Sequence, residues 1–186
     1  MKKSKFDYFD FCYDFERPGW FCYYYQLKEI WKLLKIFKKK NIKILEIGPG
    51  NGTVSDYLKK KKINVKTVDI DKRINPDING DILTIDLPSQ CFEIILCAEV
   101  LEHLDFKFFE EVLSRLSHWS KKFLILTLPE TADGKKKCSE HYWEINYKNY
   151  NLPKIKKIIK KYFKIKKTYK LPLWPYQRMF ILEKIK

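Results

Sequence analysis

Short apolar runs alternate along the chain with segments in which apolar residues recur every three or four positions. The runs, which are typical of buried strands, fall at residues 42–47, 64–69, 78–82, 92–97 and 122–128. The helical period between them predicts helices at 53–62 and 105–119. Strands and helices therefore alternate, which predicts an α/β fold: a doubly wound, mostly parallel sheet with helices on both faces.

The two ends of the chain add further elements to this sheet. Before the first strand, apolar residues at helical spacing predict a helix over 19–38 with lysines on its opposite face. After the last parallel strand, Asn151 marks the start of a helix predicted over 151–163. Two strands at 163–170 and 177–185 follow, so the fold should end in a strand pair.

A glycine-rich segment joins the first strand to the next helix. Glycines at 48, 50 and 52 have the spacing i, i+2, i+4, whereas the dinucleotide fingerprint has i, i+2, i+5. Gly48 and Gly50 let the main chain turn sharply and approach a ligand, and Pro49 stiffens the turn between them. The helix that follows presents free N–H groups and the positive end of its dipole. These features predict a nucleotide-type binding turn.

Two acids downstream lie at positions that suit the same ligand. Asp69 ends the second strand about 20 residues beyond the glycines, the placement that hydrogen-bonds ribose hydroxyls. An NAD site would share this acid, so Asp69 does not by itself separate an oxidoreductase from other nucleotide-binding proteins. Asp81 follows Gly80 in the next loop. Taken alone, Asp69 could be a turn residue and Asp81 a solvated loop acid.

The composition sets limits on size and location. A chain of 186 residues forms about one domain with a sizeable core. No apolar run reaches the roughly 18 residues that span a bilayer, and no apolar signal segment opens the chain, so we expect no membrane association. The five cysteines show no paired metal spacing, which favours reduced thiols in a cytoplasmic protein.

The formal net charge of +15 raises the question of an anionic partner. A nucleic acid would be attracted by such a charge. Specific readers of nucleic acid favour arginine, however, and only four of the 38 basic residues are arginines. The chain is also rich in Ile, Asn, Phe and Tyr, a bias that an AT-rich coding sequence would give together with lysine. We therefore interpret the lysines mostly as solvated surface and keep nucleic acid as a possible partner.

Glu46 and the three glycines together form the pattern E-x-G-x-G-x-G, and Asp69, Gly80–Asp81 and the strand at 92–97 follow in order. This series resembles the motifs of class I S-adenosylmethionine (SAM)-dependent methyltransferases, most strongly over 44–104. The resemblance implies a seven-stranded, Rossmann-like sheet whose last strand is antiparallel. It also implies SAM as the cofactor and S-adenosylhomocysteine (SAH) as its product.

The resemblance assigns cofactor contacts to particular positions. The methionine carboxylate would lie at the helix N-terminus, Asp69 would bind the ribose, and Asp81 would face the adenine amine. The residues implied to contact SAM are Glu46, Gly48, Pro49, Gly50, Gly52, Asp69, Ile70, Asp81, Ile82, Cys97, Ala98 and Glu99. Residues 41–186 would form the methyltransferase domain, and residues 1–40 an aromatic-rich extension with its helix. The aromatic stretch at 6–25 could be a lid over the acceptor pocket or plain packing on the sheet.

The chemistry outside the glycine turn lies after the fourth strand, where Glu99, Glu102 and His103 share a face if the stretch is one helical turn. His141, from the loop after the fifth strand, would lie at the same edge. Three interpretations stay open. His103 or His141 is a general base for the acceptor. Alternatively, all four residues bind a divalent metal, since the E-x-x-E-H pattern with a later His resembles the metal site of small-RNA 3′-terminal 2′-O-methyltransferases. In the third interpretation the stretch is an ordinary surface turn.

We expect methyl transfer from SAM to an oxygen or nitrogen of a small-molecule acceptor, with His141 and His103 nearest that acceptor. The alternatives are metal-assisted RNA 2′-O-methylation, a SAM-binding regulatory protein without catalysis, and an oxidoreductase that uses NAD. Within the superfamily the chain resembles small methyltransferase-domain proteins, which supports the cofactor and says little about the acceptor. A monomer or a homodimer is expected.

Overall fold

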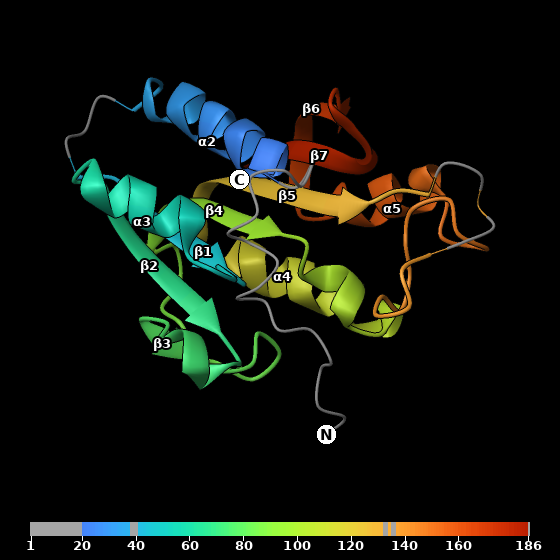
Figure 1. Cartoon of the computed structure of the whole chain (residues 1–186), viewed down its shortest axis with the longest axis horizontal. Helices are drawn as coiled ribbons and strands as arrows, with labels where there is room; N and C mark the ends of the chain where they lie inside the picture. Colours follow the sequence, from blue (N-terminus) through green and yellow to red (C-terminus); the bar gives the residue numbers. More distant parts are fainter. Residues whose placement is uncertain (1–19, 38–40, 132–133, 135–136, 186) are drawn as a thin grey trace.

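The computed structural model describes residues 20–37, 41–131, 134 and 137–185. Its centre is a seven-stranded sheet with the strand order β3-β2-β1-β4-β5-β7-β6 (Figure 1). The strands are β1 (Lys43–Ile47), β2 (Asn64–Asp69), β3 (Ile78–Asn79), β4 (Phe92–Ala98), β5 (Ser120–Pro129), β6 (Phe163–Leu171) and β7 (Trp174–Lys184). β1 to β5 are parallel, whereas β7 is antiparallel to both of its neighbours. The predicted doubly wound sheet with an antiparallel last strand is confirmed.

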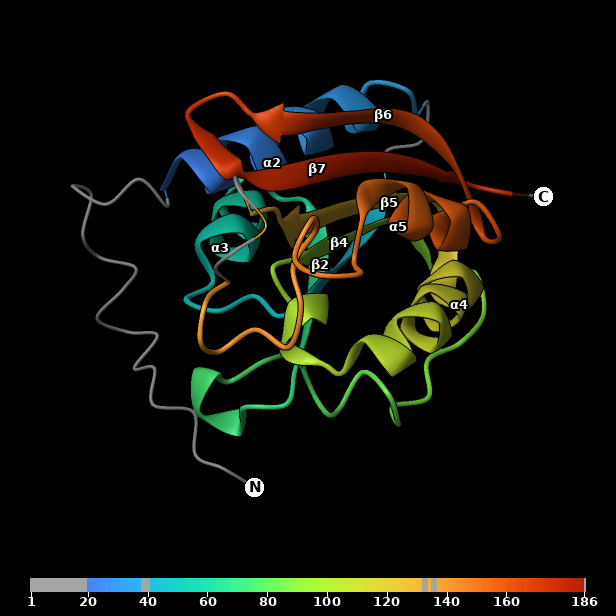
Figure 2. The same cartoon turned by 90° about the vertical axis from the view of Figure 1, so that its right-hand side faces the viewer.

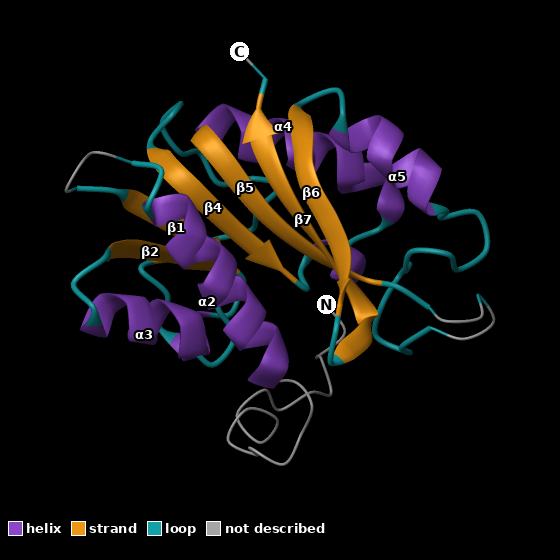
Figure 3. Cartoon of the chain, turned by 90° about the horizontal axis from the view of Figure 1, so that it is seen from above, coloured by secondary structure: helices purple, strands orange, loops and turns teal. Residues whose placement is uncertain are grey.

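Helices cover both faces of the sheet, as Figure 3 shows. The helices are α2 (Trp20–Leu34) and α3 (Thr53–Lys60) on one face, and α4 (Phe109–Trp119) and α5 (Leu152–Ile159) on the other. Each face has its own apolar cluster, one packed against α2 and α3 and the other against α4 and α5. Because β4 and β5 are covered on both faces, their sequences are almost continuously apolar.

Several predicted element boundaries are wrong by a few residues, and local contacts explain why. The helix predicted over 105–119 begins only at Phe109. Asp105 accepts the N–H of Lys107 and so caps a preceding 3₁₀ turn instead. The helix predicted over 53–62 ends at Lys60, because Lys62 has a φ of 61° and leaves the helical conformation.

The carboxyl ends of the parallel strands meet at one edge of the sheet. β7 begins at this edge because it runs in the opposite direction, with Gln177 opposite Pro129 at the end of β5. β1 lies between β2 and β4, so the strand order reverses there. Ligands of open α/β sheets bind outside the carboxyl ends at such a switch point, and this edge is therefore where a site is expected.

The first helix packs on the sheet, where α2 contacts β4, β5 and β7. The aromatic stretch that sequence analysis placed at 6–25 lies mostly outside the described residues, and the domain division at residues 40 and 41 stays a prediction.

Among the described residues, every helix is too short or too polar to cross a bilayer. Cys22, Cys91, Cys97 and Cys138 are all free thiols.

Candidate cofactor and acceptor site

The turn between β1 and α3 takes a shape that its glycines permit. Gly48, Gly50 and Gly52 have φ angles of 65°, 55° and 76°, a left-handed conformation that other residues rarely adopt. The Gly48 N–H donates to the carbonyl of Val68 at 2.9 Å, which ties the turn to β2. A Cβ atom at Gly48 would collide with the side chain of Val100. Position 48 therefore requires glycine on two independent grounds.

The start of α3 is capped by a residue that sequence analysis did not name, Asn51. Gly52 is the N-cap residue and has no side chain to accept a hydrogen bond. The Asn51 Oδ1 atom instead accepts from the N–H and the hydroxyl of Thr53, at 3.2 Å and 2.8 Å. This contact is local and fits the usual role of asparagine at helix starts, so the sequence carried a signal for it.

Glu46 in β1 is a buried acid beneath the start of α3. Its side chain hydrogen-bonds to Ser55, whereas its Oε2 atom has no hydrogen-bond partner among the described residues. Burial raises the pKa of Glu46 to about 8. A buried carboxylate oxygen without a partner is costly unless a ligand supplies a donor, so this atom suits a cationic or N–H-bearing group.

The acids after β2 and β3 lie next to one another at the same edge. The Gly80 N–H donates to the carbonyl of Asp69 at 2.9 Å, which brings the loop carrying Asp81 beside the end of β2. The Asp69 carboxylate accepts from the N–H of Asp71 at 2.8 Å, and burial raises the pKa of Asp69. Ile70, which follows Asp69, is 63% exposed and offers apolar surface at the edge.

Four of the remaining predicted cofactor contacts differ in how exposed their side chains are. Asp81 accepts from the N–H of Leu83 at 2.8 Å and is partly exposed. Ile82 and Cys97 lie in the apolar cluster against α4, and burial raises the pKa of the Cys97 thiol. A ligand at the edge could therefore contact only the main chain of these two residues. Ala98, at the end of β4, is partly exposed.

Beyond β4, the structure brings Glu102, His103 and His141 together. One ligand atom from each of these side chains lies within 4.8 Å of the others. The two imidazole rings meet edge to face, with their centroids 5.0 Å apart. The main-chain N–H of Tyr142 donates to the carbonyl of Glu102 at 2.7 Å, and this bond joins the loop after β5 to the end of β4 (Figure 2).

Residues 99–103 do not form the single helical turn that would place Glu99, Glu102 and His103 on one face. Glu99 has a φ of 53°, in the left-handed region, and only Leu101–His103 form a short 3₁₀ helix. Glu99 is outside the 4.8 Å cluster, although its charge acts on the Glu102 carboxyl. Left-handed backbone at a non-glycine residue is strained and occurs preferentially at functional sites.

Each imidazole of the cluster has one ring nitrogen engaged by a neighbour. Nδ1 of His141 lies 2.8 Å from Oε1 of Glu144, and the His103 ring donates to the main-chain carbonyl of Glu140. Burial, followed by the charge of His141, lowers the pKa of His103. A neutral imidazole held in this way by an acceptor leaves the lone pair of its other nitrogen available to a metal or a proton.

Two carboxyl groups complete the arrangement. Glu102 is 0% exposed, no N–H or O–H group of the described residues donates to its carboxylate oxygens, and its side-chain partner is the neighbouring carboxyl group of Glu99. Burial raises its pKa well above the usual range, and the charge of Glu99 adds to the effect. Glu99 accepts from the Thr127 hydroxyl at 3.0 Å, and burial raises its pKa to about 7. The two buried carboxyl groups therefore lack a compensating positive charge among the described residues, which a proton or a cation would supply.

Sequence analysis missed Glu144, Thr127 and Gln177. The last of these hydrogen-bonds to Glu99 from β7. The three-residue spacing from His141 to Glu144 could have indicated that contact, because such spacing often brings side chains together in turns. Thr127 and Gln177 lie 28 and 78 residues from Glu99, so only the folded sheet brings them to it.

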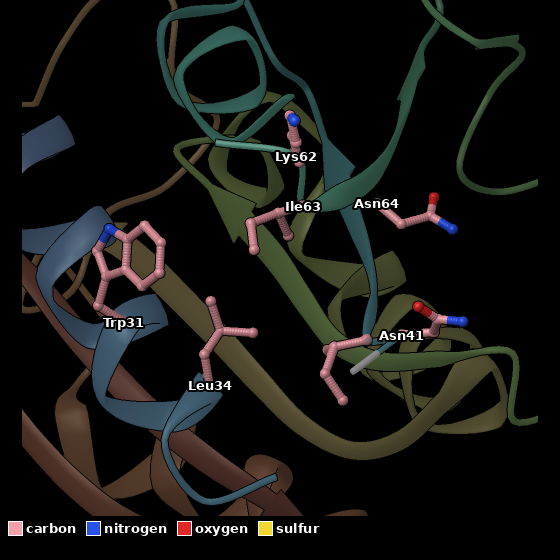
Figure 4. A pocket seen from close by; sticks show the side chains of 7 residues that line it. Trp31, Leu34, Asn41, Lys62, Ile63 and Asn64 are labelled. Carbon is pink, nitrogen blue, oxygen red and sulfur yellow. The ribbon is translucent and has the colours of Figure 1, made fainter. Parts of the chain in front are cut away.

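Among the cavities in the described part of the chain are two whose lining residues do not include the cluster. The larger, of about 220 Å³, is at the opposite edge, between α2 and the segments that lead into β1 and β2 (Figure 4). Residues 38–40, which adjoin its wall at Asn41, lie outside the described residues. The smaller, of about 120 Å³, lies beside the glycine turn and is lined by Pro49 to Gly52, Ser55 and Thr67 among others.

Comparison with known protein families shows the family to which the chain belongs. A family model described as "Methyltransferase domain" matches residues 23–177, which is most of the chain. The chain belongs to this methyltransferase-domain family. It is thus a member of the class I SAM-dependent methyltransferase superfamily, and the resemblance noted in the sequence is confirmed. No curated protein matches the chain.

Solved methyltransferase structures share the fold at low sequence identity. The magnesium protoporphyrin IX methyltransferase ChlM of Synechocystis PCC 6803, with bound SAH, has a TM-score of 0.69 and 15% identity over 89% of this chain and 84% of that one. A SAM-dependent methyltransferase of Archaeoglobus fulgidus has a TM-score of 0.64 and 16% identity over 86% and 93%. The small RNA methyltransferase HEN1 has a TM-score of 0.61 and 15% identity over 87% of this chain and 25% of that one. At this identity the likeness establishes the fold.

Proposed function

We propose that this methyltransferase-domain protein transfers the methyl group of SAM to an oxygen or nitrogen of a small-molecule acceptor. The observation that carries the proposal is the cluster of Glu102, His103 and His141, whose ligand atoms lie within 4.8 Å of one another at the edge that also carries the glycine turn. The acceptor would bind over this cluster, with its nucleophilic atom toward the cofactor.

The structure's own residues fit SAM at the glycine turn. The cofactor carries an ammonium and a sulfonium group, and Glu46 offers a buried carboxylate oxygen without a partner. Gly48 and Gly50 allow the main chain to approach the ligand, and the N–H groups at the start of α3 suit its carboxylate. Asp69 and Asp81 would bind the nucleoside. Bound there, SAM supplies an electrophilic methyl group.

His141 would act as the general base that takes the proton from the acceptor. Its Nδ1 atom is held by Glu144 at 2.8 Å, which fixes the ring and stabilises the charge that the ring gains when it takes a proton. Such a pairing fixes the tautomer and leaves the second ring nitrogen to face the acceptor, as in other carboxylate–histidine pairs. The His103 ring, whose centroid lies 5.0 Å from that of His141, forms part of the same surface.

A second candidate is metal-assisted methylation, including 2′-O-methylation of RNA, and one observation favours it. Both oxygens of Glu102 are buried and receive no N–H or O–H donor from the described residues, and each neighbouring imidazole has a second ring nitrogen besides the one engaged by its acceptor. Oxygen and imidazole ligands suit magnesium, manganese or zinc. A divalent cation held by Glu102, His103, His141 and Glu99 would bind acceptor oxygens and ease the loss of a hydroxyl proton.

The proposal is tested by transfer of a radiolabelled methyl group from SAM into a lysate of the source cell, separated into RNA, protein and small-molecule fractions. We expect label in the small-molecule fraction. Label in the RNA fraction would favour the second candidate instead. Tight SAH binding with no labelled product in any fraction would favour a regulatory SAM-binding protein and contradict the proposal.

Replacement of His141 by alanine tests the assignment of the site. We expect His141→Ala to keep the SAH affinity within about threefold and to slow methyl transfer by about 100-fold, the usual contribution of a general base. His118 on α4 provides a matched control, because it lies away from the cluster. Full activity of His141→Ala would remove His141 from the site.

A further inference from the structure

A side chain from β7, Gln177, connects the acceptor cluster to the first helix. Because β7 is antiparallel, its first residues lie at the carboxyl edge of the sheet, and Gln177 pairs with Pro129 at the end of β5. The Cys22 thiol on α2 donates to Oε1 of Gln177 at 2.7 Å. The Gln177 side chain also hydrogen-bonds to the Glu99 carboxylate. One amide thus bridges α2 and the end of β4.

The direction of each bond follows from the donor inventory. A thiol donates to the amide oxygen of Gln177, so the amide nitrogen is the group that faces Glu99. A carboxylate can only accept, and it receives a second hydrogen bond from the Thr127 hydroxyl at 3.0 Å. Donors from β5 and β7 therefore hold Glu99 from two directions.

Glu99 needs this support because its backbone is strained. Its φ of 53° is unfavourable for a residue with a side chain, and its N–H makes a long hydrogen bond of 3.3 Å to the carbonyl of Thr127. Without a donor from β7, the Glu99 carboxylate would keep only the Thr127 hydroxyl and the neighbouring Glu102 carboxyl as side-chain partners among the described residues. Ligands of metal and acceptor sites usually depend on such supporting hydrogen bonds for their orientation.

We propose that Gln177 is a positioning residue that holds the Glu99 carboxylate beside the Glu102–His103–His141 cluster, and that Cys22 holds Gln177 in turn. This inference rests on the proposed function, because it assigns a role within the same acceptor site. The start of α2 would thereby influence the acceptor site through two hydrogen bonds, although α2 contributes no side chain to the cluster itself.

The test measures Mn²⁺ affinity by calorimetry on the full-length, SAH-saturated protein. Gln177→Leu should weaken Mn²⁺ binding by about 10- to 100-fold, the usual effect of losing a supporting partner. SAH affinity should be unchanged. Cys22→Ala should weaken Mn²⁺ binding in the same direction, whereas Cys22→Ser should restore it, because a hydroxyl can donate to the same amide oxygen. A purely structural role for Cys22 would not distinguish serine from alanine in this way.

Gln90→Leu is the matched control, since this exposed glutamine lies before β4 at the opposite edge and should leave Mn²⁺ affinity unchanged. The rate of radiolabelled methyl transfer is a second measurement that needs no metal. It should fall about 10-fold or more in Gln177→Leu, with an unchanged KM for SAM. Unchanged Mn²⁺ affinity and transfer rate in Gln177→Leu would overturn the inference.

A Glu102→Gln variant distinguishes a failure of this inference from a failure of the proposed function. If Glu102→Gln loses Mn²⁺ binding or transfer and Gln177→Leu does not, the acceptor site stands and only the role of Gln177 is overturned. If the wild-type protein neither binds Mn²⁺ nor transfers a methyl group, the proposed function is wrong and the inference is overturned with it.

Discussion

The proposed cofactor side and the proposed acceptor side of the sheet edge are formed by different kinds of groups. The cofactor side uses main-chain geometry: three glycines with positive φ, the start of α3, and acids that follow β2 and β3. All of it lies within residues 46–82. The acceptor side instead uses side chains from the end of β4, from β5, from the loop that carries His141, and from β7.

This difference explains why one side can be recognised in the sequence and the other cannot. A main-chain turn such as Gly48–Gly52 needs particular residues at fixed spacing, so it leaves a local pattern. A cluster of side chains only needs to converge after folding, and many sequences can satisfy that. Both sides share one electrostatic property, since each contains a buried glutamate oxygen without a partner, in Glu46 and in Glu102.

If the cofactor binds only on the side of the glycine turn, a substitution that distorts this turn should abolish cofactor binding. Gly48→Val forces a branched residue into a φ of 65° and places its Cβ against Val100. We expect SAH affinity to fall by about 100-fold or more, since left-handed strain and overpacking each cost about 1–3 kcal/mol. Calorimetry with SAH measures the loss, and circular dichroism checks that the variant is folded.

Gly134→Val is the matched control for this prediction. Gly134 also has a positive φ, of 72°, and a Cβ there would lie 2.8 Å from the carbonyl oxygen of Asn146. It is in the loop after β5, on the acceptor side. SAH affinity should survive this change, and an equal loss in both variants would show that the two sides are not separable.

The loop that carries His141 should depend on Trp143 for its stability. Trp143 is 0% exposed and packs against Phe106 and Phe109, with ring centroids 5.0 Å and 5.1 Å away. We expect Trp143→Ala to lower the free energy of unfolding by about 3–5 kcal/mol in urea. Tyr142→Ala, next to it but 63% exposed, should change that energy by less than about 0.5 kcal/mol. Similar effects in the two variants would contradict the packing described for this loop.

Glu102→Gln should stabilise the protein while it impairs methyl transfer. Burial raises the folded-state pKa of Glu102 above its unfolded value. The free energy of unfolding of the wild-type protein therefore falls as the pH rises above about 4.5, the pKa of the unfolded chain. The gain in melting temperature should therefore be larger at pH 8 than at pH 5 in the presence of EDTA. Methyl transfer should fall about 10- to 100-fold. A variant that is destabilised at pH 8 would show that Glu102 is not a strained site residue.

Cofactor affinity should depend on pH through Glu46. Burial raises its pKa to about 8, so the free protein holds this carboxyl protonated at neutral pH. If the ionised form faces the ammonium of the cofactor, binding releases a proton, and SAH affinity should rise by about 50-fold between pH 6 and pH 8. Glu46→Gln should show weaker binding and a flat profile. A wild-type profile that is equally flat would separate Glu46 from cofactor binding.

The order of the elements and the architecture of the sheet could be predicted from the sequence, because apolar periodicity indicates which faces are buried. It did not give the boundary at Phe109, where the cap at Asp105 selects a 3₁₀ turn before the helix. It also left open whether 99–103 is one helical turn, which the left-handed backbone of Glu99 excludes. A local hydrogen bond decided the first case and the main-chain conformation of Glu99 the second, and apolar periodicity reports neither.

For the site, the sequence placed His103 and His141 at one edge, and the structure confirms that placement. Cys97 was expected to line the cofactor, yet its thiol is enclosed in the core, because strand alternation turns it toward α4. The partners Thr127 and Gln177 could not be predicted, since their contacts exist only once β5 and β7 lie beside the end of β4.

The most direct test is a calorimetric titration of SAH into the purified wild-type protein at pH 8. The account predicts saturable binding of one SAH per chain with a Kd of about 1 μM to 1 mM, the range in which enzymes usually bind their substrates. Gly48→Val should abolish the signal. The absence of saturable heat from the folded wild-type protein at several times the upper limit would contradict the assignment of the glycine turn to SAM.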